Sequence, residues 1–236
     1  MAGVSAGLLA QAGFTGAPAL TVEGPEVAEF WSDLGQKWLI VDQYFKPHAV
    51  CRWAQPAMTG ALSLYQTHNL SPESIRRIRV FSFHEATRLA CRHPQTTEEA
   101  QYSLPFPVAA TLVHGQLGPA QLSGEALTDP VILALADRVE LIEDEAYNAH
   151  FPALRLSRVE IETTDGQWFD SGEVQANWDI TSPPTDTELH KKFRWLAQTN
   201  LLASRATAIK KTVWQYANLS DAQELITLLT PPPQIG

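Results

Sequence analysis

The segment Lys46–Ala57, which reads KPHAVCRWAQPA, holds the residues of this chain that are best suited to chemistry. A lysine and a cysteine stand five positions apart, and Arg52 follows the cysteine directly. Pro47 disfavours helical dihedrals at the residue before it, while Pro56 suits a first helical turn, so a loop that leads into a helix is predicted. Two cations beside the free amides of a helix start suit carboxylates. The alternative is an ordinary loop with two solvated cations.

Three further segments make the interpretation more specific. They read SAGLLAQAGFTG at Ser5–Gly16, AQYSLPFPVAATLVHG at Ala100–Gly115 and TDTELHKKFRWLA at Thr185–Ala197. Together with the loop, and in this order, they resemble the MmgE/PrpD family, whose activities include dehydration of 2-methylcitrate, decarboxylation of cis-aconitate and epimerisation of iminodisuccinate. The resemblance implies the C-terminal portion of a longer pattern. The family's other half, which supplies a helical domain with active-site histidines and an aspartate, is expected from elsewhere.

The resemblance implies a lyase or isomerase, similar to 2-methylcitrate dehydratase, that acts on a small di- or tricarboxylate. Reactions beside a carboxylate need a base, an acid for the leaving group and cations that hold the substrate. This chemistry requires no cofactor, and no metal-ligand cluster, GxGxxG, P-loop or HExxH pattern is visible in the sequence. Two alternatives stay open: a non-catalytic module that binds carboxylates or partners, and one half of a split enzyme.

Two residues are predicted to be catalytic, Lys46 and Tyr102. Lys46 matches the loop lysine of the family, and its expected role is to bind a substrate carboxylate or to stabilise charge that develops there. Many relatives carry a tyrosine where this chain has Phe106, so Tyr102, one helical turn earlier, is expected to present a hydroxyl instead. A surface lysine and a packed tyrosine are the alternatives. The predicted substrate-binding set is Lys46, Arg52, Cys51, Gln55 and Ser103.

The other members of this set each have a plainer interpretation as well. Arg52 can hold a carboxylate with two hydrogen bonds, or it can pair with an acidic side chain of the protein. Cys51 can ionise more readily beside two cations, or it can serve as a small buried apolar residue. Gln55 replaces a histidine common in relatives, so it can orient a substrate but can transfer no proton near neutral pH. Ser103 is expected to assist Tyr102.

Helices mixed with antiparallel strands position these residues, which predicts an α+β fold. Strands are expected at 75–83, 139–143 and 159–164, with a return strand at 168–174, and residues 38–45 can form another. Helices are expected at 2–12, 25–34, 56–66, 103–114, 129–137 and 220–229, and a long one from a capping signal at Thr185–Glu188 through Trp214. Three regions follow: residues 1–36 as a helical-domain fragment, 37–184 as a small mixed α/β lid domain, and 185–236 as helices that return to the helical domain.

The composition is that of a globular protein, with 236 residues of which 44% are hydrophobic and 18% are charged. The formal net charge of -9 argues against a nucleic-acid or anionic-membrane partner, because both need a cationic surface. Cys51 and Cys91 give no disulfide framework and no paired metal ligands, and the apolar start lacks the cationic region of a signal peptide, so a cytoplasmic protein is predicted. The expected partners are a small polycarboxylate and either a second copy, as the resemblance implies, or a complementary N-terminal half.

Overall fold

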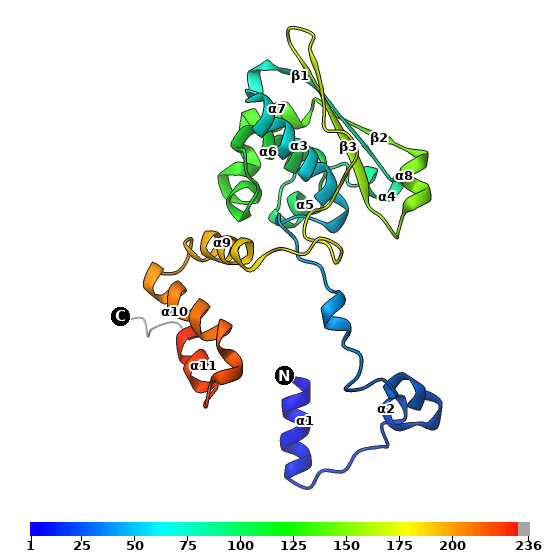
Figure 1. Ribbon diagram of the computed structural model, residues 1–236, viewed down its shortest axis with the longest axis vertical. Helices are drawn as coiled ribbons and strands as arrows, with labels where there is room; N and C mark the ends of the chain where they lie inside the picture. The colour runs from blue at the N-terminus through cyan, green and yellow to red at the C-terminus, as the bar shows by residue number, and fades with distance from the viewer. Residues whose placement is uncertain (231–236) are drawn as a thin grey trace. The chain divides into compact units, whose positions relative to one another are not determined.

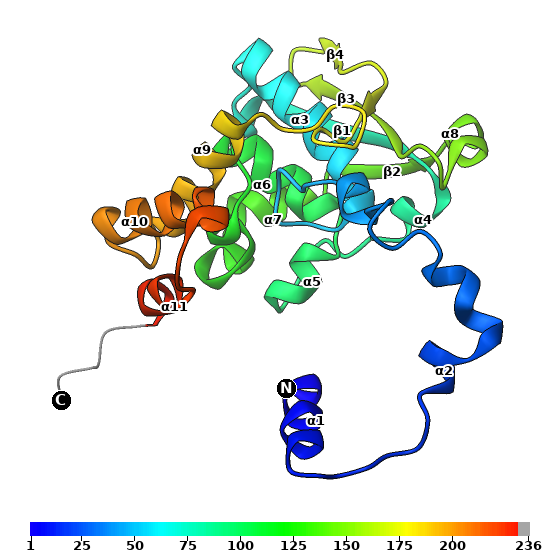
Figure 2. The same ribbon diagram turned by 60° about the horizontal axis from the view of Figure 1, so that its bottom comes forward.

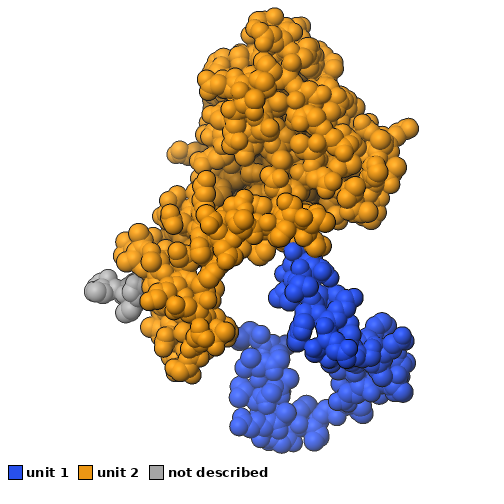
Figure 3. All heavy atoms as spheres, in the orientation of Figure 1, with its two compact units in different colours: residues 1–43 blue, residues 44–236 orange. Residues whose placement is uncertain are grey.

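The computed structural model describes residues 1–230, and the chain divides after Gln43 into two compact units (Figure 3). The first unit contains the helices α1 (Ala2–Gln11) and α2 (Leu20–Glu23) and two 3₁₀ turns, Pro25–Trp31 and Leu39–Asp42. The possible strand at 38–45 is therefore wrong, because residues 39–42 turn instead of extending. Among residues 1–43 only Gly24 is buried, so this unit has no apolar core of its own.

The second unit is built around a mixed sheet in the strand order β2-β1-β3-β4 (Figure 1). The strands are β1 (Ile75–Ser82), β2 (Val139–Glu143), β3 (Leu156–Thr163) and β4 (Trp168–Asp170), and the short β5 (Val174–Gln175) also pairs with β3. β1 pairs antiparallel with β3 but parallel with β2, whereas the sequence pattern predicted antiparallel strands throughout. The parallel pair is possible because the helical segment between the two strands carries the chain back across the sheet.

Helices cover one face of this sheet, which confirms the α+β fold (Figures 1 and 2). The three longer ones are α3 (Gln55–His68), α6 (Pro105–His114) and α7 (Pro130–Ala136), and each has a proline in its first turn. The shorter helices are α4 (His84–Thr87), α5 (Thr97–Gln101) and α8 (Glu145–His150), and 3₁₀ turns occupy Arg52–Ala54, Pro72–Ser74, Pro119–Leu122, Gly124–Thr128 and Tyr216–Asn218.

The two faces of the sheet differ in chemistry, as the alternation along β1 and β3 predicts. Ile78 and Val80 of β1 and Val159 and Ile161 of β3 are fully buried in the core beneath the helices. The intervening residues carry charge and face each other across the strands, with Arg77 opposite Glu162 and Arg79 opposite Glu160. The sheet therefore has one packed face and one face of charged pairs.

The last region contains three helices: α9 (Asp186–Ala197), α10 (Ala203–Trp214) and α11 (Gln223–Leu229). The capping signal is confirmed, since Thr185 and Glu188 form a reciprocal capping box at the start of α9. The prediction of one long helix through Trp214 is wrong, because the amides of Asn200 and Leu201 both bond to the carbonyl of Ala197 and close α9. The tail PPPQIG lies outside the described residues.

Candidate functional site

The loop that carries Lys46 is held on two sides by backbone hydrogen bonds. The amide of Cys51 donates to the carbonyl of Gln101 at 2.8 Å, next to Tyr102, and the amide of Phe45 donates to the carbonyl of Trp178 at 3.1 Å. The first bond joins two of the segments that were singled out in the sequence, although about fifty residues separate them.

Gln55 fixes the loop from inside. Its Nε2 donates to the carbonyls of His48 at 2.9 Å and Val50 at 3.0 Å, and its Oε1 accepts from the amide of His48 at 3.3 Å. The side chain is fully buried, and both donors of the amide are engaged. Gln55 therefore positions the loop, and its contact with a substrate stays a prediction.

A cavity of about 270 Å³ lies beside this loop. It brings together three of the residues predicted from the sequence, Lys46, Cys51 and Tyr102. The complete lining is Lys46, His48, Ala49, Val50, Cys51, Gln101, Tyr102 and Lys192. No carboxylate is among these residues, so the positive charges of the two lysines are not balanced within the lining. Such a cavity attracts a small anion.

Lys192 is the member of this lining that the sequence analysis missed. It lies on α9, and its Nζ donates to the carbonyl of Lys46. Burial lowers the pKa of Lys192, and the nearby charge of Lys46 lowers it further. The segment TDTELHKKFRWLA was noted for its resemblance, but nothing in its local pattern distinguishes the lysine that reaches the loop from its neighbour Lys191.

His48 is a neutral imidazole near pH 7. Burial lowers its pKa to about 4, and the charge of Lys192 acts in the same direction, while a hydrogen bond with the backbone of Leu117 acts against them. An imidazole in this state can donate and accept hydrogen bonds, but it is a weak base. His48 lies in the same loop but was not among the site residues predicted from the sequence.

Arg52 does not line the cavity. Its guanidinium pairs with the carboxylate of Asp179 and stacks 3.9 Å from the centre of the Tyr44 ring. The sequence left two partners open for Arg52, a substrate carboxylate and an acidic side chain of the protein. The structure shows the acidic side chain. Nε and Nη1 of Arg52 are buried without a hydrogen-bond partner. Arg52 therefore secures the Lys46 loop to the segment that precedes α9.

Ser103 and Phe106 both point into the protein interior. The hydroxyl of Ser103 donates to the carbonyl of Cys91 at 2.5 Å and accepts from the amide of Phe106 at 3.2 Å, and both side chains are fully buried. The predicted helix at 103–114 begins two residues later, at Pro105, so Tyr102 precedes α6 instead of lying one turn before Phe106 on it. Tyr102 is 59% exposed and reaches the cavity without Ser103.

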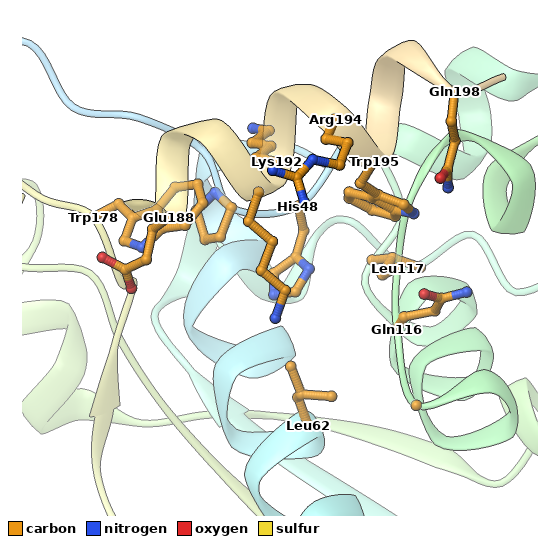
Figure 4. A pocket seen from close by; sticks show the side chains of 13 residues that line it. His48, Leu62, Gln116, Leu117, Trp178, Glu188, Lys192, Arg194, Trp195 and Gln198 are labelled. Atoms are coloured by element: carbon orange, nitrogen blue, oxygen red, sulfur yellow. The ribbon is translucent and has the colours of Figure 1, made fainter. Parts of the chain in front are cut away.

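A second, larger cavity of about 520 Å³ adjoins the first, since His48 and Lys192 line both. Its walls come from the start of the Lys46 loop, from α3, from the segment after α6 and from α9 (Figure 4). Trp178, Trp195, Leu62 and Leu117 supply apolar surface, and Lys191, Lys192 and Arg194 supply positive charge. We refer to this cavity as the tryptophan chamber and to the smaller one as the lysine cavity.

Within residues 1–230, no group of three or more histidine, cysteine, aspartate or glutamate side chains is arranged to hold a metal ion. In the same part of the chain, none of the helices combines the length and the apolar character needed to span a bilayer.

The fold and the site describe an α+β protein with a small cationic cavity beside a larger one. Residues 48–217 match the MmgE/PrpD C-terminal domain, a span of well over half of the sequence. The chain belongs to the MmgE/PrpD family. Over 140 residues it is 27% identical to a cis-aconitate decarboxylase-like protein, oryM, of Aspergillus oryzae, and the aligned part is 58% of this chain and 28% of that protein. The chain thus spans little more than a quarter of the length of this curated relative.

Proposed function

We propose that this chain supplies the carboxylate-binding C-terminal domain of a lyase that acts on a small di- or tricarboxylate. The observation that carries the proposal is the lining of the lysine cavity. Lys46 and Lys192 come from segments far apart in the sequence, the charge of Lys46 lowers the pKa of Lys192, and no carboxylate lines the space beside them. A bound carboxylate relieves the repulsion between two such ammonium groups.

The same residues suit the chemistry of the family. When a bond beside a carboxylate breaks, negative charge spreads onto that carboxylate, and ammonium groups held in place stabilise it. Tyr102 can donate a hydrogen bond to the substrate, whereas the free ring nitrogen of the neutral His48 can accept one, because its N–H is bonded to the backbone of Leu117. A substrate carboxylate bound near His48 raises the proton affinity of the imidazole, so substrate binding itself favours a proton-transfer role for this residue.

Among the possible reactions, decarboxylation has the support of the relative's name. Loss of carbon dioxide leaves a carbanion that must be protonated, and this requires stabilising cations and an acid more than a strong base. Dehydration and epimerisation both begin by abstracting a proton, and the buried His48 is a weak base for that step.

One half of a split enzyme, or a non-catalytic carboxylate-binding module, is the second candidate. The observation in its favour is the low pKa of His48, which makes this histidine a weak base. All of these candidates require that the lysine cavity binds carboxylates. Turnover in the presence of a complementary chain is expected for a lyase domain and for a split half, but not for a non-catalytic module.

Calorimetric titration of the purified chain with succinate and with cis-aconitate tests the proposal. We expect both to bind, and we expect Lys46→Ala and Lys192→Ala each to weaken binding by about tenfold, since an ionic hydrogen bond in such a site is worth roughly 1.5 kcal/mol. Lys211→Ala, which removes an exposed lysine of α10, serves as the matched control and should bind normally. Binding that is unchanged in both cavity variants contradicts the proposal.

A further inference from the structure

The tryptophan chamber and the lysine cavity are neighbours that share two lining residues. His48 and Lys192 belong to both, and the ammonium of Lys192 lies between the carbonyl of Lys46 on one side and the ring of Trp178, 5.6 Å from its centroid, on the other. A ligand whose carboxylate reaches Lys192 therefore has the chamber directly beside it (Figure 4).

The two spaces differ in size and in chemistry. The lysine cavity, at about 270 Å³, is smaller than ordinary small-molecule pockets, which begin at roughly 300 Å³, whereas the chamber, at about 520 Å³, falls within their range. Two indole rings and two leucines contribute apolar surface to the chamber. A dicarboxylate without an apolar group leaves that surface in contact with water.

Both tryptophans are held in place by backbone features that constrain them. Trp195 lies so close to Gly118 that a Cβ at this glycine would meet the indole Cζ2 at 2.1 Å. Trp178 has a left-handed backbone, with φ of 64°, and its carbonyl accepts the hydrogen bond from Phe45. This conformation is strained for a bulky residue, and such strain is found mainly where a side chain must be presented in one direction.

The charges around the chamber favour a ligand that is itself anionic. Lys191, Lys192 and Arg194 contribute three positive charges, and Glu188 is the one acidic residue of the lining. The carboxylate of Glu188 accepts hydrogen bonds at 2.8 Å from both the amide and the hydroxyl of Thr185, which lower its pKa and commit it to the start of α9.

From these observations we infer that one ligand occupies both cavities: a di- or tricarboxylate that carries an apolar arm of several carbons. The carboxylates lie at Lys46 and Lys192, and the arm lies between Trp178 and Trp195. This inference rests on the proposed function, and it narrows the substrate class from small polycarboxylates to alkyl-substituted ones.

The test compares succinate, 2-butylsuccinate and hexanoate by calorimetric titration of the purified chain. We expect 2-butylsuccinate to bind at least about tenfold more tightly than succinate, because fully burying two CH₂ groups already supplies that factor. Hexanoate, which has the arm but a single carboxylate, should bind more weakly than 2-butylsuccinate. Equal affinities for succinate and 2-butylsuccinate overturn the inference and leave the proposed function standing, provided that succinate binding still depends on Lys46.

Substitutions in the tryptophan chamber test whether the apolar arm binds there. Trp195→Ala should abolish most of the gain from the butyl group and leave the affinity for succinate unchanged, while Trp168→Ala, which removes a 43% exposed tryptophan of β4, should keep the gain. Leu62→Asn makes the chamber wall polar without removing a large ring, so it supplies the same test should Trp195→Ala fail to fold. A gain that persists in both chamber variants overturns the inference. Failure of succinate itself to bind overturns the proposed function and the inference together.

Discussion

At the residue scale, His48 couples the lysine cavity to the stability of the protein. In the unfolded chain its pKa is the ordinary value of 6.5, and in the folded protein burial lowers it to about 4. The unfolded state therefore binds more protons between these two pH values. The contribution of His48 is fully favourable above pH 6.5, is lost progressively as the pH falls toward 4, and changes no further below that.

We predict that the free energy of unfolding falls by about 2 kcal/mol between pH 7 and pH 4.5 on account of this residue, at 1.36 kcal/mol for each unit of separation. His48→Gln, which cannot titrate, should show a shallower decline over the same interval. Urea unfolding at half-unit steps of pH measures both. Parallel curves for the two proteins would show that another group controls the acid transition.

Arg52 was predicted either to bind substrate or to pair within the protein, and in the structure it pairs with Asp179. Its side chain is 8% exposed and that of Asp179 is 32% exposed, so the pair is only partly screened by water. We expect Arg52→Ala to destabilise the protein by about 1–3 kcal/mol, because it leaves Asp179 without its partner and removes the stacking on Tyr44.

Arg52→Lys is the informative companion variant, since a lysine keeps the charge but cannot stack as a planar group. It should recover only part of the lost stability in thermal or chemical unfolding. Full recovery would show that charge alone matters here. Both variants should still bind succinate, although more weakly if the Lys46 loop loosens.

At the element scale, the loop before α3 depends on a single amide side chain. Gln55→Ala removes three hydrogen bonds to the backbone of residues 48–50. We predict a loss of about 2–3 kcal/mol in stability and faster hydrogen exchange at His48 and Val50, since each bond contributes roughly 1 kcal/mol. Gln66→Ala, on an exposed turn of the same helix, is the matched control. Unchanged exchange in the loop would mean that the Cys51–Gln101 bond suffices to hold it.

Much of the fold was predictable where local patterns decide it. The starts of α3, α7 and α9 follow from prolines and caps, and β1 follows from alternating arginines and apolar residues. The break between α9 and α10 carries neither proline nor glycine, so the amphipathic pattern runs on across it. The parallel pairing of β1 with β2 depends on contacts between distant segments, and no local pattern encodes it.

The candidate site divides in the same way. Lys46, Cys51 and Tyr102 were predicted from segments that carry the family resemblance, and all three line the lysine cavity. Lys192 and the tryptophan chamber were missed, because they exist only once α9 packs beside the loop. Ser103, Gln55 and Arg52 were predicted to bind substrate from the same segments. Their hydrogen bonds are directed to the protein itself, which residue type cannot reveal.

At the scale of the whole molecule, the first unit presents apolar side chains without burying them. Leu8, Phe14, Phe30, Trp38 and Ile40 are all exposed in it. Short helices of this kind rarely persist in water unless a partner covers their apolar side. These exposed side chains therefore suit a surface that further protein structure covers.

We therefore predict that the isolated chain has little or no decarboxylase, dehydratase or epimerase activity, and that an N-terminal half from a relative restores it. Turnover of cis-aconitate, 2-methylcitrate and iminodisuccinate should be assayed for the chain alone and for the mixture, with a Lys46→Ala chain as the control. Fluorescence of a dye that binds exposed apolar surface should fall on mixing. Substantial turnover by the chain alone, abolished by Lys46→Ala, would contradict this prediction.

The order of the strands also bears on how this protein reaches its native state. β1 lies inside the sheet, yet both of its neighbours are made much later: Ile78 pairs with Val139 on one side and with Ile161 on the other. Pairings so distant in sequence raise the contact order, which slows folding. During synthesis β1 keeps two open edges until β2 and β3 emerge from the ribosome, and open edges invite aggregation. The arginines that give the mature sheet its charged face are residues of the kind that opposes edge-to-edge association of an open strand.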